Sequence, residues 1–94
     1  MYSFDEKKME FYKVIFTKSV KKDFRKIPKL EVSKILYEIE ELAKNPRSSK
    51  TKKLKGEKLF RLRVGNYRVI YDIQDNLMLI FVVKLGHRSD IYRN

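Results

Sequence analysis

The apolar positions of the chain change in spacing from one end to the other, and each spacing predicts a different element. The run at residues 11–16 is aromatic and β-branched, which predicts a first strand. Thr17 is of a residue type that caps helices, and the spacing after it predicts a short amphipathic helix to about Ile27, before Pro28. Residues 30–44 carry apolar side chains three and four positions apart. This predicts a second helix and, with the short linker, a helical hairpin.

The second half of the chain has the period-two pattern of strands. Apolar and basic residues alternate over residues 59–64. The pair Gly65-Asn66 is typical of a two-residue hairpin turn, and residues 67–73 predict the return strand. Residues 77–85 are apolar apart from Lys84, so we expect a central strand, buried on both faces, that ends at the glycine after this run.

These elements together predict an α+β fold. It consists of an N-terminal strand, a helical hairpin and a three-stranded antiparallel β-meander, with the helices packed on one sheet face. The 94 residues, 43% of them hydrophobic, suit a single domain spanning residues 1–94. We expect the polar residues 1–8 to be loosely ordered.

The two-residue turn also predicts which side chains share a face of the sheet. It places Arg63 opposite Arg68 and Arg61 opposite Ile70, and directly opposed residues point to the same side. The other side is then apolar and forms the seat of the helices, with Phe60, Leu62, Val64, Tyr67, Val69 and Tyr71. Opposed like charges destabilise a sheet, so three clustered guanidinium groups indicate an anionic ligand, and the planar fork of arginine suits phosphodiester oxygens. The alternative is a solvated basic face, screened by counterions and by Asp72.

The charge of the chain extends this picture. There are 23 Lys and Arg against 12 Asp and Glu, a formal net charge of +11, which favours a polyanionic partner. Residues 44–63 hold nine of the basic residues and a single acidic one. Such a run is either a solvated loop or a phosphate-binding surface, and its candidate residues are Lys50, Lys52, Lys53, Lys55 and Lys58.

Residue counts exclude several chemistries. The chain has no cysteine, so it has no disulfide, thiol nucleophile or thiolate metal site. His87 is the only histidine, which excludes a nuclease that uses two histidines as acid and base. We therefore expect neither a metal nor a cofactor. The absence of an apolar run of about 20 residues and of a signal-peptide pattern predicts a cytoplasmic protein with no membrane partner.

The tail after the last predicted strand carries polar side chains that can reach the arginine cluster. We expect His87, Arg88 and Tyr92 to lie over the same basic face. Histidine titrates near neutral pH and suits proton transfer, although a lone histidine is also common as a bystander. Tyr92 is either a packing residue or an exposed functional hydroxyl.

Three stretches of the sequence resemble the RelE/ParE superfamily of bacterial and archaeal toxins. They are Lys53-Leu54-Lys55-Gly56, then residues 60–71, and then Leu85-Gly86-His87-Arg88 followed by Ile91-Tyr92. The resemblance to the RelE branch implies a toxin that cleaves messenger RNA in the ribosomal A site and is held inactive by a RelB-like antitoxin. It implies that the working positions are Arg61, Arg63, Arg68, Arg88 and Tyr92, and that the basic residues before the second of the family's strands, Lys53 and Lys55 here, contact RNA.

The mechanism that the resemblance implies uses the 2′-OH of the RNA as nucleophile and leaves a 2′,3′-cyclic phosphate and a 5′-OH. The arginines would position and neutralise the phosphate. Some relatives carry lysine where this chain has Arg61 and Arg63, and arginine effectively cannot lose its proton, so a proton-transfer role does not suit these two. The resemblance favours Tyr92 as the base, ionised with the help of nearby cations, and His87 is the alternative acid or base. Two rivals stay open: a ParE-like inhibitor of DNA gyrase and a non-catalytic RNA-binding module.

Overall fold

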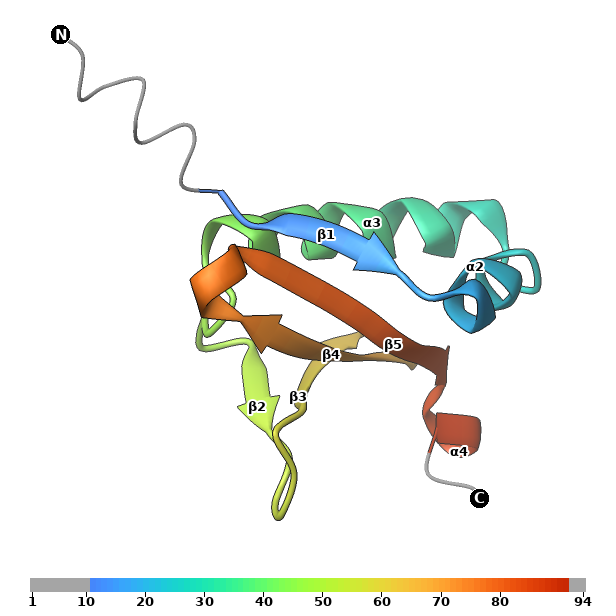
Figure 1. The fold of residues 1–94 in the computed structure, drawn as a ribbon. Coiled ribbons are helices and arrows are strands. Elements are labelled where there is room, and N and C mark those ends of the chain that lie inside the picture. Colours follow the sequence, from blue (N-terminus) through green and yellow to red (C-terminus); the bar gives the residue numbers. More distant parts are fainter. Residues whose placement is uncertain (1–10, 92–94) are drawn as a thin grey trace, which may run out of the picture.

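The computed structural model describes residues 11–91, so the expectation about residues 1–8 lies outside the described part (Figure 1). In chain order the elements are β1 (Lys13–Phe16), α2 (Lys18–Phe24), α3 (Lys29–Lys44), β2 (Thr51–Lys53), β3 (Phe60–Val64), β4 (Tyr67–Gln74), the 3-10 helix η1 (Asp75–Leu77), β5 (Leu79–His87) and α4 (Arg88–Ile91). The predicted elements are all present, and three further short ones, β2, η1 and α4, were not predicted.

The strands form one five-stranded sheet in the order β1-β5-β4-β3-β2 (Figure 1). The first strand pairs with β5 in parallel, and the other neighbours are antiparallel. Helices α2 and α3 cover one face, which confirms the predicted α+β class and helix placement. We call the opposite face, to which α2 and α3 do not contribute, the helix-free face.

The lysine-rich stretch before β3 differs from its expected form. Thr51–Lys53 is strand β2, and Lys52 lies opposite Arg61 at the edge of the sheet. The stretch gives no strand signal because it is only three residues long and mostly charged. Charged residues are suited to an edge strand, since they oppose pairing with another chain.

Local sequence explains the helix boundaries. The Thr17 hydroxyl oxygen accepts a hydrogen bond from the backbone N–H of Val20 (3.3 Å), which is the predicted N-cap of α2. Helix α2 ends at Phe24, three residues before the expected end at Ile27. Helix α3 begins directly after Pro28, whose fixed φ suits a helix start.

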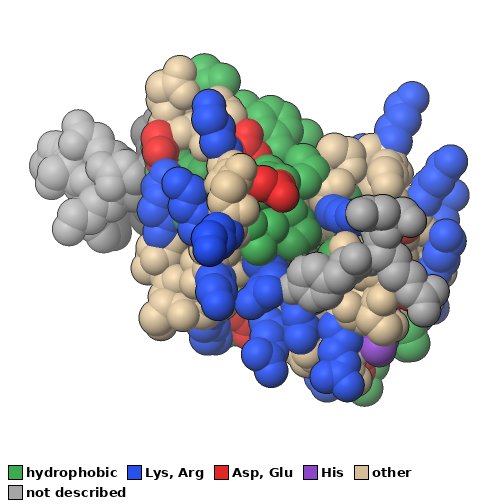
Figure 2. All heavy atoms as spheres, turned by 90° about the horizontal axis from the view of Figure 1, so that it is seen from below, with side chains coloured by type: hydrophobic (Ala, Val, Ile, Leu, Met, Phe, Trp, Pro, Cys, Tyr) green, Lys and Arg blue, Asp and Glu red, His purple; other side chains and the backbone are tan. Residues whose placement is uncertain are grey.

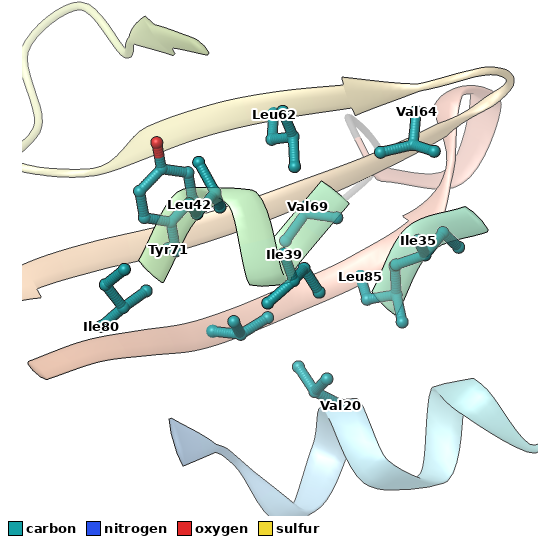
Figure 3. Packing of buried hydrophobic residues seen from close by; sticks show 11 residues of the cluster. Val20, Ile35, Ile39, Leu42, Leu62, Val64, Val69, Tyr71, Ile80 and Leu85 are labelled. Atoms are coloured by element: carbon teal, nitrogen blue, oxygen red, sulfur yellow. The ribbon is translucent and has the colours of Figure 1, made fainter. Parts of the chain in front are cut away.

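The core lies between the helices and the apolar side of the sheet (Figure 3). Ile35, Ile39 and Leu42 of α3 and Val20 of α2 face strand residues. The strand residues in the buried cluster are Leu62, Val64, Val69, Tyr71, Ile80, Val82 and Leu85. Phe60 and Tyr67 pack against this cluster, so the predicted apolar side is confirmed.

The predicted register of the β3–β4 hairpin is also confirmed. Val64 pairs with Tyr67, Arg63 with Arg68 and Leu62 with Val69. Gly65 has a φ of +57°, a left-handed conformation that glycine adopts without strain. A two-residue turn therefore sets the register, and Arg61, Arg63 and Arg68 share the helix-free face.

Strand β5 contains a β-bulge that shifts its alternation by one residue. Val82 pairs with Tyr71 and Lys84 with Ile70, so the register between these pairs passes over Val83. Ile80 and Val82 face the helices before the bulge, and Leu85 faces them after it. Lys84 consequently lies on the helix-free face.

The expectation for β5 is therefore only partly met. The strand is central, as predicted, and continues past Gly86 to His87. Its helix side is buried, whereas Phe81 and Val83 are only partly buried and Lys84 is exposed. Burial on both faces was wrong because neither α2 nor α3 covers the second face.

An exposed polar cluster joins three distant parts of the chain. Asp75 accepts two hydrogen bonds from the Arg47 guanidinium (3.1 and 2.8 Å) and one from the Tyr12 hydroxyl (2.6 Å). Hydrogen bonds from Arg47, and then from Tyr12, lower the pKa of Asp75 to about 2. The Arg47 guanidinium also lies over the Phe60 ring, 5.6 Å from its centre. The cluster thereby ties the segment before β1 and the 3-10 helix η1 to the loop after α3.

The cluster predicts a pH-dependent contribution to stability. Because the pKa of Asp75 is lowered in the folded protein, the contribution is present above the ordinary value of 3.8 and is lost as the pH falls towards about 2. Asp75→Asn should therefore be less stable than the wild type at pH 6, and the difference should shrink from pH 4 to pH 2. Urea unfolding of both proteins across this range measures it, and a difference that does not change with pH would contradict it.

Candidate nucleic-acid interface

The strand register arranges basic residues in two rows across the helix-free face. One row contains Arg63 and Arg68, with Gly86 next in line. The other row runs from strand to strand through Lys52, Arg61, Ile70 and Lys84. Figure 2 shows that many Lys and Arg side chains gather on this side of the molecule. We call these two rows the cationic rows.

Arg68 differs from its neighbours because it is buried. It is only 8% exposed, and its Nη1 donates hydrogen bonds to the carbonyl oxygens of Gly65 (3.1 Å) and Tyr67 (3.0 Å). The guanidinium thus braces the β3–β4 turn. Arg63 opposite it is exposed and Arg61 is partly buried, so the face offers guanidinium groups in three different environments.

The bracing contact makes Arg68 a stability determinant. Arg68→Ala should lower the free energy of unfolding by about 1–3 kcal/mol, because two hydrogen bonds from a charged donor are lost. Arg63→Ala removes an exposed side chain and should change stability by less than about 0.5 kcal/mol. Urea unfolding of both variants and the wild type makes the comparison, and equal stabilities would show that Arg68 does not brace the turn.

The predicted lysines are spread over different surfaces. Lys52 belongs to a cationic row, whereas Lys53 pairs with Phe60 and so lies on the helix side of the sheet edge. Lys50 contacts Glu38 of α3 (3.3 Å). Lys55 and Lys58 lie in the β2–β3 loop, where residues 53–58 line an open hollow of about 640 Å³. Only Lys52 of the five extends the arginine cluster.

His87 does not lie over the arginine cluster, which corrects the expectation. It pairs with Tyr67 on the helix side of the sheet, and the two rings meet edge to face at 5.7 Å. Its Nδ1 lies 2.9 Å from the Ser89 hydroxyl oxygen and accepts a hydrogen bond from the Ser89 N–H (3.2 Å). With Asp23 and Asp90 it lines a hollow of about 530 Å³ beside α2. The bulge causes this, since a one-residue shift moves later side chains to the other face.

The short helix α4 brings the tail to the helix-free face. The backbone N–H of Arg88, an exposed residue, donates to the Asn66 carbonyl oxygen (2.7 Å), which joins α4 to the β3–β4 turn. Gly86 pairs with Arg68, and a Cβ added to it would lie 3.6 Å from Ile91 Cδ1. Ile91 therefore packs over Gly86 on the face that holds Arg68. Tyr92 lies outside the described residues.

Lys84 also lies on the helix-free face, although the sequence analysis did not predict it as a site residue. It is exposed, and it is the one charged residue of a nine-residue strand that is otherwise apolar up to Gly86. A single lysine in an apolar strand is a sequence signal for a functional residue. In a regular strand, however, Lys84 would point towards the core and not towards the arginines. Asp72, expected to screen the arginines, accepts a hydrogen bond from Gln74 Nε2 (2.6 Å).

The described residues offer neither a metal-ligand group nor a membrane-spanning helix. Within residues 11–91, no group of three or more His, Asp or Glu side chains is placed to hold a metal ion. Among the described helices, none has the length and apolar character that crossing a membrane requires. The described part of the chain thus forms a small basic domain with a helix-covered sheet face and a cationic one.

Comparison with known proteins identifies the family of this domain. Residues 14–92 match the model of the ParE toxin of the type II toxin–antitoxin system parDE. The chain is 30% identical to toxin RelG of Mycobacterium tuberculosis over 84 residues, covering 87% of this chain and 97% of the relative. It is 31% identical to the putative toxin RelE1 of Methanocaldococcus jannaschii over 87 residues, covering 88% and 97%.

Solved structures agree with this assignment. The archaeal RelE–RelB complex from Pyrococcus horikoshii has a TM-score of 0.76 at 30% identity, over 85% of this chain and 98% of that one. The RelBE2 toxin–antitoxin complex from Mycobacterium tuberculosis has a TM-score of 0.74 at 27% identity, over 83% and 99%. The chain belongs to the RelE/ParE toxin superfamily, and it is a RelE-family toxin of a type II toxin–antitoxin system.

Proposed function

We propose that the protein is a metal-free endoribonuclease that cleaves messenger RNA in the ribosomal A site and so inhibits translation. The observation that supports this most is the pair of cationic rows on the helix-free face. Cations gathered on one sheet face repel one another in the free protein, and a phosphodiester backbone would neutralise the exposed Arg63 together with its neighbours in the two rows. The match to RelG and RelE1 favours this branch of the superfamily.

The proposed chemistry is attack of the RNA 2′-OH on the adjacent phosphorus. The 2′-OH gives its proton to the base and its oxygen forms a bond to phosphorus, while the bond to the 5′-oxygen breaks. The 5′-oxygen takes a proton from water, so the products carry a 2′,3′-cyclic phosphate and a 5′-OH. Arg61 and Arg63 supply positive charge for the phosphorane, with Arg68 held in place by the turn and Arg88 at the start of α4. The chain reaches this face at Ile91, and Tyr92, the next residue, is the proposed base.

The placement of His87 argues against a role for this residue as acid or base in the reaction. His87 lies on the opposite side of the sheet from Arg61 and Arg63, so an acid or base at this position would have to act across the sheet. We therefore do not assign it to the reaction. His87→Ala should retain cleavage activity, in contrast to changes on the helix-free face.

We also propose a RelB-like antitoxin as the neutralising partner and the cytoplasm as the site of action. Three of the similar solved structures are toxin–antitoxin complexes: RelE–RelB from Pyrococcus horikoshii, RelBE2 from Mycobacterium tuberculosis and RelB–RelE from Methanococcus jannaschii. An acidic segment that covers the cationic rows would block RNA and complement the net charge of +11.

Primer extension on a defined messenger RNA tests the proposal. The protein is added to programmed ribosomes and, separately, to naked RNA, and the 3′ ends of the products are analysed. Cuts that need the ribosome and leave a 2′,3′-cyclic phosphate are expected. A 3′-OH product would overturn the mechanism, and cuts in naked RNA would remove the ribosome as a requirement.

The second candidate is inhibition of DNA gyrase, which the match of residues 14–92 to the ParE toxin model favours. A gyrase supercoiling assay with the same preparation separates the two. Loss of supercoiling without RNA cleavage would identify the gyrase inhibitor. RNA binding without RNA cleavage and without loss of supercoiling would support the third possibility, a non-catalytic RNA-binding module.

A further inference from the structure

We infer that Lys84 binds the RNA backbone, as the far end of a cationic row that crosses four strands of the helix-free face. This inference rests on the proposed RNA function and extends its site from β3 and β4 to the central strand. The observation that carries it is the β-bulge in β5, which places the single lysine of that strand on the same face as the arginines.

The bulge decides the direction of Lys84. Val82 and Leu85 both belong to the buried cluster, although in a regular strand residues three apart point to opposite faces. The extra residue between the pairs Tyr71–Val82 and Ile70–Lys84 removes this conflict. Bulges often occur next to functional sites, where they redirect a side chain, and Lys84 is the charged side chain redirected here.

The row has the dimensions of a backbone-binding track. Adjacent strands are about 4.8 Å apart, so the α-carbons from Lys52 to Lys84 span roughly 14 Å. An extended RNA strand lying along the row meets cations on β2, β3 and β5. The second cationic row, with Arg63 and Arg68, runs beside it.

Ile70 separates the charges within the row. It lies between Arg61 and Lys84 and is only 5% exposed, although it is on the helix-free face. Long basic side chains can cover an apolar neighbour with their methylene stems while their charged ends stay in solvent. The α-carbons of the two flanking cations are two strand spacings apart, about 9.6 Å, which allows the cations to contact different phosphates.

Lys84 forms no ion pair with any of the described residues. The ion pairs of the described residues link Lys34 with Glu31, Lys44 with Glu41, Arg47 with Asp75, and Lys50 with Glu38, and none of them involves Lys84. Lys84 is exposed on a face that already carries Lys52, Arg61 and Arg63, so its charge adds repulsion in the free protein. The negative phosphates of a bound RNA backbone would attract Lys84 and offset this repulsion.

RNA binding at varied salt tests the inference. The probe is a 12-nucleotide single-stranded 2′-O-methyl RNA with a fluorescent label, which lacks the nucleophilic 2′-OH and so stays intact during the measurement. Affinities are measured from 50 to 300 mM salt for the wild type, Lys84→Gln, Lys84→Arg and Lys29→Gln. Lys29 is an exposed residue at the start of α3, so Lys29→Gln removes the same charge from the helix layer.

One lost phosphate contact should reduce the slope of log affinity against log salt by about 0.7, which corresponds to about fivefold weaker binding at 0.1 M salt. We expect this change for Lys84→Gln and not for Lys84→Arg or Lys29→Gln. A merely structural role would not change the salt slope. If Lys84→Gln matches Lys29→Gln, or if the wild type does not bind the probe, the inference is wrong.

The inference and the proposed function fail separately. Ribosome-dependent cleavage by the wild type together with an unchanged salt slope in Lys84→Gln would refute RNA binding by Lys84 and support the proposed enzyme activity. A reduced salt slope in Lys84→Gln without any cleavage by the wild type would support RNA binding by the row and refute the proposed enzyme activity.

Discussion

Replacement of both Arg61 and Arg63 with alanine should lower the rate of ribosome-dependent RNA cleavage by about 10³-fold or more. Groups that stabilise the charge of a transition state are typically worth about 10²–10³ each, and effects within one site are not additive. Arg63 is exposed, and Arg61 and Arg63 lie in neighbouring cationic rows. Single-turnover cleavage on programmed ribosomes measures the effect.

The matched control removes the same charge from the helix layer. Lys21 and Lys29 are exposed residues of α2 and α3, and the double change Lys21→Ala with Lys29→Ala should keep activity within about threefold of the wild type. Arg68→Ala is a poorer test, because Arg68 also braces the turn. Equal losses in the two double variants would mean that total charge, rather than the helix-free face, governs activity.

Exchange of two neighbouring residues, Lys84→Leu with Leu85→Lys, should lower the free energy of unfolding by at least about 3 kcal/mol. The exchange preserves composition and net charge. Leu85 is 4% exposed and belongs to the buried cluster, so the exchange removes an apolar side chain from the core and puts an ammonium group in its place.

The direction of this effect distinguishes two geometries of β5. Without the bulge, Lys84 would be the buried residue, and the exchange would stabilise the protein. The single change Lys84→Leu is the control and should alter stability by less than about 1 kcal/mol, because its site is exposed. Urea unfolding of the three proteins, followed by circular dichroism, separates the two geometries.

Sequence periodicity predicted element boundaries and side-chain faces well where the backbone is regular. The apolar spacing predicted α3 to within one residue, because one continuous face of that helix packs on the sheet. The pair Gly65-Asn66 predicted the partners of Arg61 and Arg63, since a two-residue turn leaves one register for the hairpin. The arginine cluster was therefore predictable from local sequence alone.

The errors lie where tertiary structure overrides local pattern. The bulge near Val83 leaves no sequence signal in a run of apolar residues, and it placed His87 on the face opposite to the expected one. The strand β2 is too short and too charged to show alternation. The contacts of Asp75 with Tyr12 and Arg47 join residues far apart in the chain, which spacing arguments do not reach.

The parallel pairing of β1 with β5 also has a consequence for biosynthesis. Lys13 pairs with Leu79, so the first strand made by the ribosome must wait for the last before it enters the sheet. Helix α3 can form early from local contacts, whereas the central strand of the sheet, with Lys84 on it, is synthesised after the other four strands. The cationic face is therefore incomplete until β5 has been synthesised and has paired with β4 and β1.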